Sequence, residues 1–366
     1  MISLKKIIIL LLFIIPVNIK AYDTSATSAI LMEQKTNRII YAKNIHNKRS
    51  IASISKIMTA ILAIESDKLY DTVKVTDVVN KAYGSGIYVK PGEELKLIDL
   101  VYGLMLRSGN DAALQIANTV CENEDDFVKL MNDKAKEVGM KDTTFNNPSG
   151  LEEKGGNIST AYDMALLMSY AMKNEIFRMI TGTRKYQLKT NMNNYFWVNK
   201  NKLLTLYKYT TGGKTGFTDV AKRTLVTTAS KDNLDLVVVT LNEGNDFLDH
   251  QNLYKEAYEN YKSYEIVKEG LFEVYGEDFY KESFYVKEGF SYPLSNTEKN
   301  DIILKIDLVK KENYENDEKI GNVVIKLQNK ELNNIDIFIK KKEKKSFFQK
   351  IKEWFKNLWS ALFGLY

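Results

Sequence analysis

Cysteine and histidine are scarce in this chain. Its 366 residues include one cysteine, Cys121, and two histidines, His46 and His250. A single cysteine excludes an internal disulfide, and we expect Cys121 to pack at a helix end rather than to take part in chemistry. Two isolated histidines argue against a Ser-His-Asp triad and against a cluster of metal ligands. We therefore expect neither a metal nor a cofactor, and an exposed His46.

Long apolar runs are also missing. The apolar run at residues 7–16 is shorter than the roughly 18 residues expected of a bilayer span. It follows Lys5 and Lys6 and precedes a polar stretch that ends at Ala21, which is the layout of a secretory signal peptide. We expect residues 1–21 to be a signal peptide that is cleaved near Ala21, and the protein to be exported. An uncleaved N-terminal anchor is the alternative.

Lysine and aromatic residues are concentrated near the C-terminus. Wound as a helix at about 100° per residue, residues 347–362 place apolar side chains on one arc and charged side chains on the other. Such a helix is typical of one that lies in an anionic membrane surface. We therefore expect residues 342–366 to be an amphipathic membrane-anchor helix, with packing on the protein's own core or on a partner as the alternative. The net charge of +5 owes much to this tail, so it does not indicate nucleic-acid binding.

Ser53 and Lys56 form the first of three short motifs. They stand three residues apart at the start of a helix-like run, so their side chains share a face. A serine is a poor nucleophile near neutral pH unless a base lies beside it. Lysine can be that base only if burial or a nearby positive charge lowers its pKa. On its own, S-x-x-K arises often by chance.

Two further motifs follow in a fixed order. Ser108-Gly109-Asn110 is expected to form a short loop between the apolar helical stretches Leu97–Leu106 and Asp111–Ala117. Lys214-Thr215-Gly216 opens a strand-like segment and offers a charge, a hydroxyl and a backbone that can be approached closely. In the order S-x-x-K, S-x-N and K-T-G, these motifs are the set found in penicillin-binding proteins and class A β-lactamases.

The length of the exported chain indicates two domains, because it exceeds that of one average domain. Up to residue 262, strand patterns mix with helical ones, which indicates an α+β domain. From residue 263 the pattern alternates with period two, so residues 263–341 are expected to form a small β-rich domain, a spacer or interaction module. Expected helices are Glu124–Val138 and Ala161–Met172, and expected strands are Leu304–Leu308, Val323–Leu327 and Ile335–Ile339, with a charged turn at Asn313–Lys319.

The chain resembles the low-molecular-mass penicillin-binding proteins that are serine-type D-Ala-D-Ala carboxypeptidases, of the penicillin-binding protein 5 type. The resemblance is dense over residues 25–262 and looser to about residue 340. It implies a β-lactamase/transpeptidase-like fold over residues 22–262, with an antiparallel sheet, helices and a helical subdomain. The segments that carry it are Ala52–Ala60, Val89–Glu93, Asp99–Met105, Asn147–Leu151, Ser159–Asp163 and Gly213–Thr218.

The resemblance also implies a mechanism on peptidoglycan stem peptides that end in D-Ala-D-Ala. Ser53 would attack the penultimate D-Ala carbonyl, with neutral Lys56 as its base, and Ser108 would pass a proton to the leaving amine. Asn110 would bind the substrate peptide and steady Lys56. Lys214 would keep Lys56 deprotonated and, with Thr215 and Thr218, bind the terminal carboxylate. The backbone N–H groups of Ser53 and of Phe217 or Thr218, just after Gly216, would form the oxyanion hole.

The chain departs from the family pattern in three places. The family often has proline where Ile51 stands and histidine where Ser149 stands, and neither position is expected to touch the chemistry. Many relatives carry a carboxylate-binding arginine near the segment Asp246–Asp249, which has none here, so Arg223 is a candidate substitute.

Other activities share this motif set. A β-lactamase must also hydrolyse penicillin quickly, usually through a glutamate-activated water, and the chain has no clear E-x-x-x-N site; Glu152 and Glu153 only imitate one. A D,D-endopeptidase or transpeptidase would use the same residues. A penicillin-recognising protein without catalysis is a further class, against which the three intact motifs argue. A carboxypeptidase would be inhibited covalently by β-lactams.

Overall fold

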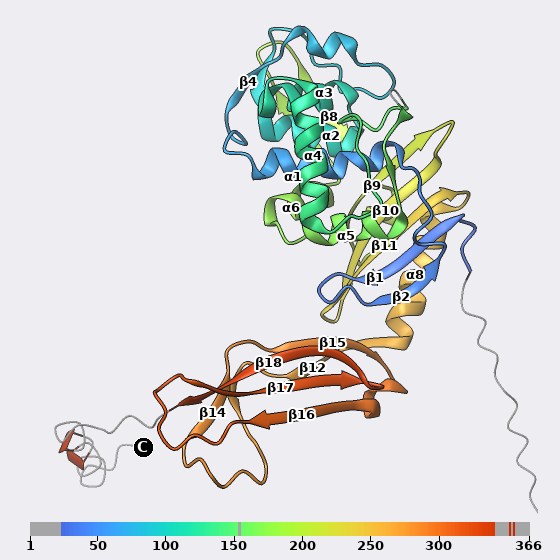
Figure 1. Ribbon diagram of the computed structural model, residues 1–366. Helices are drawn as coiled ribbons and strands as arrows, with labels where there is room; N and C mark the ends of the chain where they lie inside the picture. Colours follow the sequence, from blue (N-terminus) through green and yellow to red (C-terminus); the bar gives the residue numbers. More distant parts are fainter. Residues whose placement is uncertain (1–22, 153–154, 341–350, 353, 356–366) are drawn as a thin grey trace, which may run out of the picture. The chain divides into compact units, whose positions relative to one another are not determined.

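The computed structural model describes residues 23–152, 155–340, 351–352 and 354–355 (Figure 1). The expected signal peptide and most of the expected membrane-anchor helix lie outside the described residues, so both stay predictions. Among the described residues, no helix combines the length and the apolar character needed to cross a bilayer. The described chain divides into two compact units, the first centred on residues 41–229 and the second running on from Ala257. The first also includes 237–256 and the chain up to Met32, and the second includes 33–40 and 230–236.

The first unit contains a five-stranded sheet. Its strand order is β2-β1-β11-β10-β9, so β9 lies at an edge and has a described neighbour on one side only. The central strands β10 and β11 are buried on both faces, as their near-continuous apolar and threonine runs require. The strands are β1 (Ser28–Glu33), β2 (Ile39–Lys43), β9 (Thr210–Thr218), β10 (Lys222–Lys231) and β11 (Leu234–Glu243).

Helices cover both faces of this sheet (Figure 1). On one face α8 (Asp246–Asn260) packs through His250, whose two ring nitrogens contact the hydroxyls of Thr227 at 2.7 Å and Thr240 at 2.9 Å. His250 is fully buried, and burial lowers its pKa to about 3, so it is a neutral structural residue. On the other face, apolar side chains of β10 and β11 join the large core that surrounds α1.

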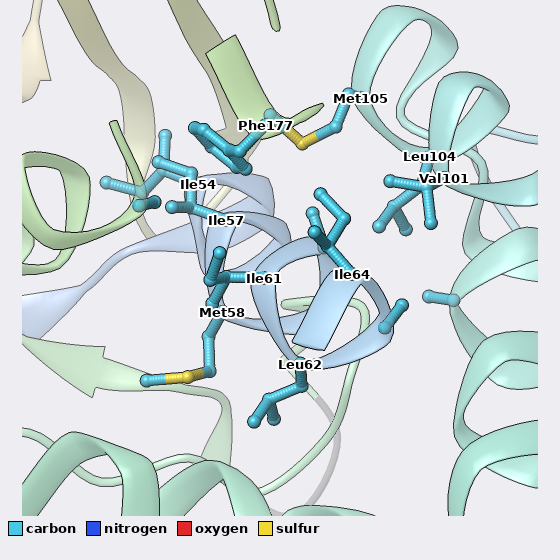
Figure 2. Packing of buried hydrophobic residues seen from close by; sticks show 14 of the residues in the cluster. Ile54, Ile57, Met58, Ile61, Leu62, Ile64, Val101, Leu104, Met105 and Phe177 are labelled. Atoms are coloured by element: carbon cyan, nitrogen blue, oxygen red, sulfur yellow. The ribbon is translucent and has the colours of Figure 1, made fainter. Parts of the chain in front are cut away.

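Helix α1 (Lys56–Glu65) runs through the middle of that core. Every residue from Lys56 to Ile64 is buried, so the helix is enclosed on all sides, and its residues other than Lys56 and Thr59 are apolar. Figure 2 shows Ile57 of α1 beside Phe177 of α6 (Glu175–Gly182), and Ile64 on the side of Val101 and Leu104 of α2 (Leu97–Arg107). This packing fixes the start of α1, and therefore the first motif, in the interior.

The remaining elements of the first unit agree with several expectations. Helix α4 spans Glu124–Val138 as predicted, and α5 ends one residue before the predicted Met172. Asn123 and Thr160 cap these helices by accepting the N–H groups of Asp126 and Asp163. The others are α3 (Asn110–Cys121), α7 (Leu203–Leu206), the 3-10 turns Ala52–Ser55 and Asp77–Lys81, and strands β3 (Arg49–Ser50), β4 (Thr72–Lys74), β5 (Glu94–Lys96), β6 (Ile158–Ser159), β7 (Lys185–Lys189) and β8 (Asn194–Val198).

The second unit is rich in strands. A five-stranded sheet of order β13-β14-β18-β17-β16 carries the three predicted strands within β16, β17 and β18, and β12 pairs with β15. Alternate residues of β18 are buried, as the period-two pattern predicts. The mixed architecture is the α+β class expected. The strands are β12 (Tyr261–Val267), β13 (Gly270–Phe272), β14 (Ser283–Val286), β15 (Phe290–Ser295), β16 (Ile302–Leu308), β17 (Lys319–Leu327) and β18 (Lys330–Lys340), with a 3-10 turn at Glu298–Asp301.

Candidate active site

Ser53 lies in the 3-10 turn that leads into α1, and Lys56 is the first residue of that helix. The spacing of three residues is therefore found in a 3-10 turn that leads into the helix. A 3-10 turn has three residues per turn, so side chains at i and i+3 lie above one another. The Lys56 Nζ is 3.0 Å from the Ser53 Oγ. Ser53 is half-buried and opens into a hollow of about 480 Å³.

The loop at residues 147–151 holds this turn in place from the other side. A Cβ on Gly150 would lie 2.0 Å from the carbonyl oxygen of Ala52, and Gly150 has a φ of +81°, so only glycine fits there. Ala52 itself has a φ of +48°. The Ser149 carbonyl accepts a hydrogen bond from the Lys56 amine. The position of Ser149 therefore does touch the chemistry, against expectation, but through its backbone, which any residue supplies.

Lys56 has the surroundings of a neutral base. Its Nζ also donates to the Asn110 Oδ1 at 2.7 Å, and the side chain is wholly buried. A neutral amine has two N–H groups and one lone pair, so it can donate to Asn110 and Ser149 and accept the hydroxyl proton of Ser53. Burial, together with the charge of Lys200, lowers the pKa of Lys56 to about 7.

The second motif forms the next wall of the hollow. Ser108 ends α2 with a φ of +65° and lines the hollow, whereas Asn110 begins α3. The expected three-residue loop is thus shorter, since Asn110 is already helical. The Asn110 Nδ2 donates to the Tyr83 carbonyl at 2.6 Å, which turns its Oδ1 toward Lys56.

The third motif lies within β9 rather than at its start. Gly216 pairs with Thr224 of β10, and a Cβ on Gly216 would lie 2.4 Å from the Thr224 Oγ1 and 3.0 Å from the Ser53 nitrogen. No side chain fits there, so β9 lies directly against the turn that carries Ser53. β9 is an edge strand, and Thr181 already bonds both backbone groups of Gly213. An N–H group further along β9, beside the Ser53 N–H, would give the arrangement that an oxyanion hole needs.

Lys214 is buried beside Lys56 and is not a simple fixed cation. Its Nζ donates to the Thr215 carbonyl at 2.7 Å, and 1% of the residue is exposed. Burial, followed by the charges of Lys56 and Lys200, lowers the pKa of Lys214 well below its usual value. Two amines in one buried region compete for protons. Burial and then the charge of Lys200 lower the pKa of Lys56, so Lys200 joins Lys214, which the sequence predicted, as a cation near this base.

Lys200 was missed from the sequence because an isolated lysine in a polar stretch gives no signal. It follows β8, is half-buried, and donates from its Nζ to the Ser85 Oγ at 3.0 Å. It lines the hollow with Ser53, Ser108 and Thr215.

Removing the charge of Lys200 is expected to move the pH dependence of Ser53 reactivity. In Lys200→Gln the pKa of Lys56 rises, so more Lys56 is protonated near pH 7. Reaction with a penicillin at pH 7 should slow by about threefold to tenfold, with little change at pH 9. Lys200→Arg keeps the charge and should retain the profile. Rates measured from pH 5 to pH 9 test this, and an unshifted profile in Lys200→Gln would contradict it.

The two remaining candidate residues, Thr218 and Arg223, have different partners. The Thr218 hydroxyl donates to the Glu152 Oε1 at 2.5 Å, and Ser50 donates to the same oxygen at 2.7 Å. Glu152 thus connects β9 to the neighbouring loop, a role that no sequence pattern predicts. Arg223 lines the hollow, with its Nη1 3.6 Å from the Asp246 Oδ1. The full lining is Ser53, Ser85, Ser108, Lys200, Lys202, Thr215, Gly216, Phe217, Arg223, Asp246 and Phe247.

Within the described part of the chain, no group of three His, Cys, Asp or Glu side chains is placed to hold a metal ion. Cys121 is half-buried, and burial raises the pKa of its thiol, which makes it less reactive.

The chain is similar to several known proteins. Residues 16–245 match the Peptidase_S11 family model, described as D-alanyl-D-alanine carboxypeptidase. The chain is 39% identical over 220 residues to D-alanyl-D-alanine carboxypeptidase DacF of Bacillus subtilis, which covers 58% of this chain and 56% of that protein. It is 32% identical over 221 residues to DacB2 of Mycobacterium tuberculosis, covering 60% and 75% of the two chains. The crystal structure of penicillin binding protein 5 from Haemophilus influenzae has the same fold, with a TM-score of 0.73 and 22% identity over 88% of this chain and 98% of that one.

Proposed function

The chain belongs to the D-alanyl-D-alanine carboxypeptidase family Peptidase_S11, and from this premise we propose that it removes the terminal D-Ala from peptidoglycan stem peptides. The match spans little more than half the length of the Bacillus subtilis relative. The observation that carries the proposed activity is the buried Lys56 amine, 3.0 Å from the Ser53 hydroxyl and with a pKa of about 7. Such a base can activate a serine at neutral pH.

In the acylation step, the Ser53 oxygen attacks the carbonyl carbon of the penultimate D-Ala. The Ser53 proton passes to Lys56, and the oxyanion accepts hydrogen bonds from the N–H groups of Ser53 and Phe217. Collapse of this intermediate breaks the peptide bond, and the leaving amine takes a proton through Ser108. The products are an ester on Ser53 and free D-Ala. Attack by water on the ester then restores the Ser53 hydroxyl and releases the shortened peptide.

The terminal carboxylate of the substrate is bound on the β9 side of the hollow. Lys214 and Thr215 supply a buried amine and a hydroxyl, and Arg223 supplies the guanidinium that the segment 246–249 lacks. Asp246 orients Arg223 across a 3.6 Å ion pair. Thr218 acts indirectly, since its hydroxyl is engaged by Glu152. A β-lactam carries the same carboxylate beside a strained amide, so it acylates Ser53 and departs slowly.

We also propose that the protein acts at the outer face of the cytoplasmic membrane. An exported protein with residues 342–366 on the outer face of the cytoplasmic membrane would meet wall peptides where they are assembled. The apolar run after Lys5 and Lys6 supports export, and the basic aromatic tail supports contact with an anionic surface.

A paired assay tests the function. The protein is incubated with a stem pentapeptide that ends in D-Ala-D-Ala, and separately with penicillin, and products are identified by mass. We expect release of one D-Ala per pentapeptide and slow turnover of penicillin. Fast penicillin hydrolysis without D-Ala release would identify a β-lactamase instead. Stable penicillin binding without D-Ala release would identify a non-catalytic receptor.

A further inference from the structure

One edge of the five-stranded sheet in the second unit is open. Strand β16 (Ile302–Leu308) comes last in the order β13-β14-β18-β17-β16, and Figure 1 shows it as the outermost strand. Within the described residues, no strand pairs with its outer side. An open edge presents backbone N–H and C=O groups that another strand can join. The opposite edge, β13 (Gly270–Phe272), has only three residues, and such a short strand offers little to pair with.

The backbone of β16 shows which groups point away from the sheet. The Val309 N–H donates to the Ile320 carbonyl at 2.8 Å, so the backbone groups of Val309 face β17. The antiparallel pairing of β16 with β17 leads up to this position without a bulge. Since backbone groups alternate between the two sides of a strand, those of every second residue face β17. The N–H and C=O groups of Leu304, Ile306 and Leu308 therefore point outward.

Large apolar side chains accompany this open edge. Ile303 is 53% exposed, Leu304 is 42% exposed and Val309 is 66% exposed. Ile306 and Leu308 pack against the core of the unit but are only half-buried. An exposed edge strand with apolar side chains tends to pair with another strand, so this composition favours an edge that is covered.

Lys305 and Asp307 are the two charged residues of β16. Their side chains are 63% and 51% exposed, and they form a 2.9 Å ion pair along the strand. A lysine alone on an edge strand discourages pairing between copies. Asp307 cancels that effect wherever Lys305 of one copy lies opposite Asp307 of another, because opposite charges across a pair of strands attract. The strand thus carries charges that complement those of its own copy.

We propose that β16 pairs antiparallel with β16 of a second copy of the chain, with Ile306 on the two-fold axis. This register places Lys305 of each copy opposite Asp307 of the other, and Leu304 opposite Leu308. The outward backbone groups then meet, and the two Ile306 residues exchange both of their hydrogen bonds. The charged residues occupy the non-hydrogen-bonded positions, where facing side chains come closest.

The charges select this register over its neighbours. An axis centred on Lys305 would place the two lysines opposite each other, and an axis centred on Asp307 would do the same to the two aspartates. In the proposed register, the same patch of both copies forms the interface, as two-fold symmetry requires. The two five-stranded sheets become one, and neither copy keeps an open β16 edge. One pair of strands makes a small interface, so the dimer is expected to form and dissociate with concentration.

The first test measures the mass of the full-length protein by light scattering between about 1 and 100 μM, the range in which a small interface dissociates. We expect the wild type to pass from the mass of one copy to that of two. Lys305→Glu and Asp307→Lys each place like charges opposite each other twice in the dimer. Each should raise the dissociation constant by about tenfold to hundredfold. The matched control is Lys330→Glu, which reverses an exposed lysine at the start of β18 and should associate like the wild type.

Mixing the two single variants separates a contact between copies from a defect within one copy. In a mixed pair the substitutions restore opposite charges at both contacts, so the mixture should associate although neither variant does so alone. The double variant Lys305→Glu/Asp307→Lys should associate as well. A mixture that fails to associate, or association that ignores both single variants, would overturn the inference. A wild type that keeps the mass of one copy throughout would also overturn it, and would mean that another segment or another protein covers this edge.

Discussion

Ser53→Ala is expected to abolish covalent labelling of the protein by a fluorescent penicillin. The label is an ester on the Ser53 oxygen, so no slower route should remain once that oxygen is removed. Ser53 is half-buried and only its hydroxyl is lost, so the fold should remain stable to within about 1 kcal/mol. Labelling is measured on a denaturing gel, with thermal unfolding measured alongside.

Ser85→Ala is the matched control for that experiment. Ser85 is a second serine of the same hollow, it is exposed, and its hydroxyl accepts a hydrogen bond from Lys200. The Ser85→Ala variant should still be labelled by the penicillin at Ser53. Label that persists in Ser53→Ala, or that disappears in Ser85→Ala with Ser53 intact, would place the nucleophile elsewhere.

Lys56→Met is expected to slow acylation by on the order of 10²–10⁴, the usual contribution of a positioned general base. Methionine retains the length and apolar stem of lysine but cannot accept the Ser53 proton. The wild-type rate should rise with pH and level off above about 7, because Lys56 acts only when it is deprotonated and its pKa is about 7. In Lys56→Met this rise should disappear.

Stopped-flow acylation from pH 5 to pH 9 separates this role from a purely structural one. A structural defect would lower the rate at every pH and leave the shape of the profile unchanged. Lys74→Met, which replaces an exposed lysine on β4, should behave like the wild type. A Lys56→Met profile that still rises near pH 7 would assign the base to another group.

The sequence predicted those parts of the site that depend on local spacing. Ser53 and Lys56 meet because three residues separate them, and this holds in a 3-10 turn as well as in an α-helix. Helix α4 could be placed because Asn123 caps one end and Gly139, with a φ of +88°, ends the other. The alternating pattern likewise predicted the strands of the second unit.

Contacts between distant segments could not be predicted in this way. Lys200 reaches Ser85 across 115 positions of the chain, and the bond between Thr218 and Glu152 joins two segments whose pairing depends on how β9 packs. The contact of Lys56 with the Ser149 carbonyl comes from backbone, which carries no residue signature. Such contacts follow from the tertiary fold and not from spacing.

The burial of Lys56 has a consequence for the thermal stability of the protein. A lysine in the unfolded chain keeps its ordinary pKa of 10.5, whereas in the fold that pKa is about 7. Below pH 7 the folded state must hold a buried charge, a penalty on the order of 5 kcal/mol that fades as the pH rises toward 10.5. The pKa of Lys214 is lowered in the same direction, which adds to this penalty. The melting temperature should therefore fall in acid because of the same amines that activate Ser53, and an anionic ligand bound beside them should restore it most at low pH.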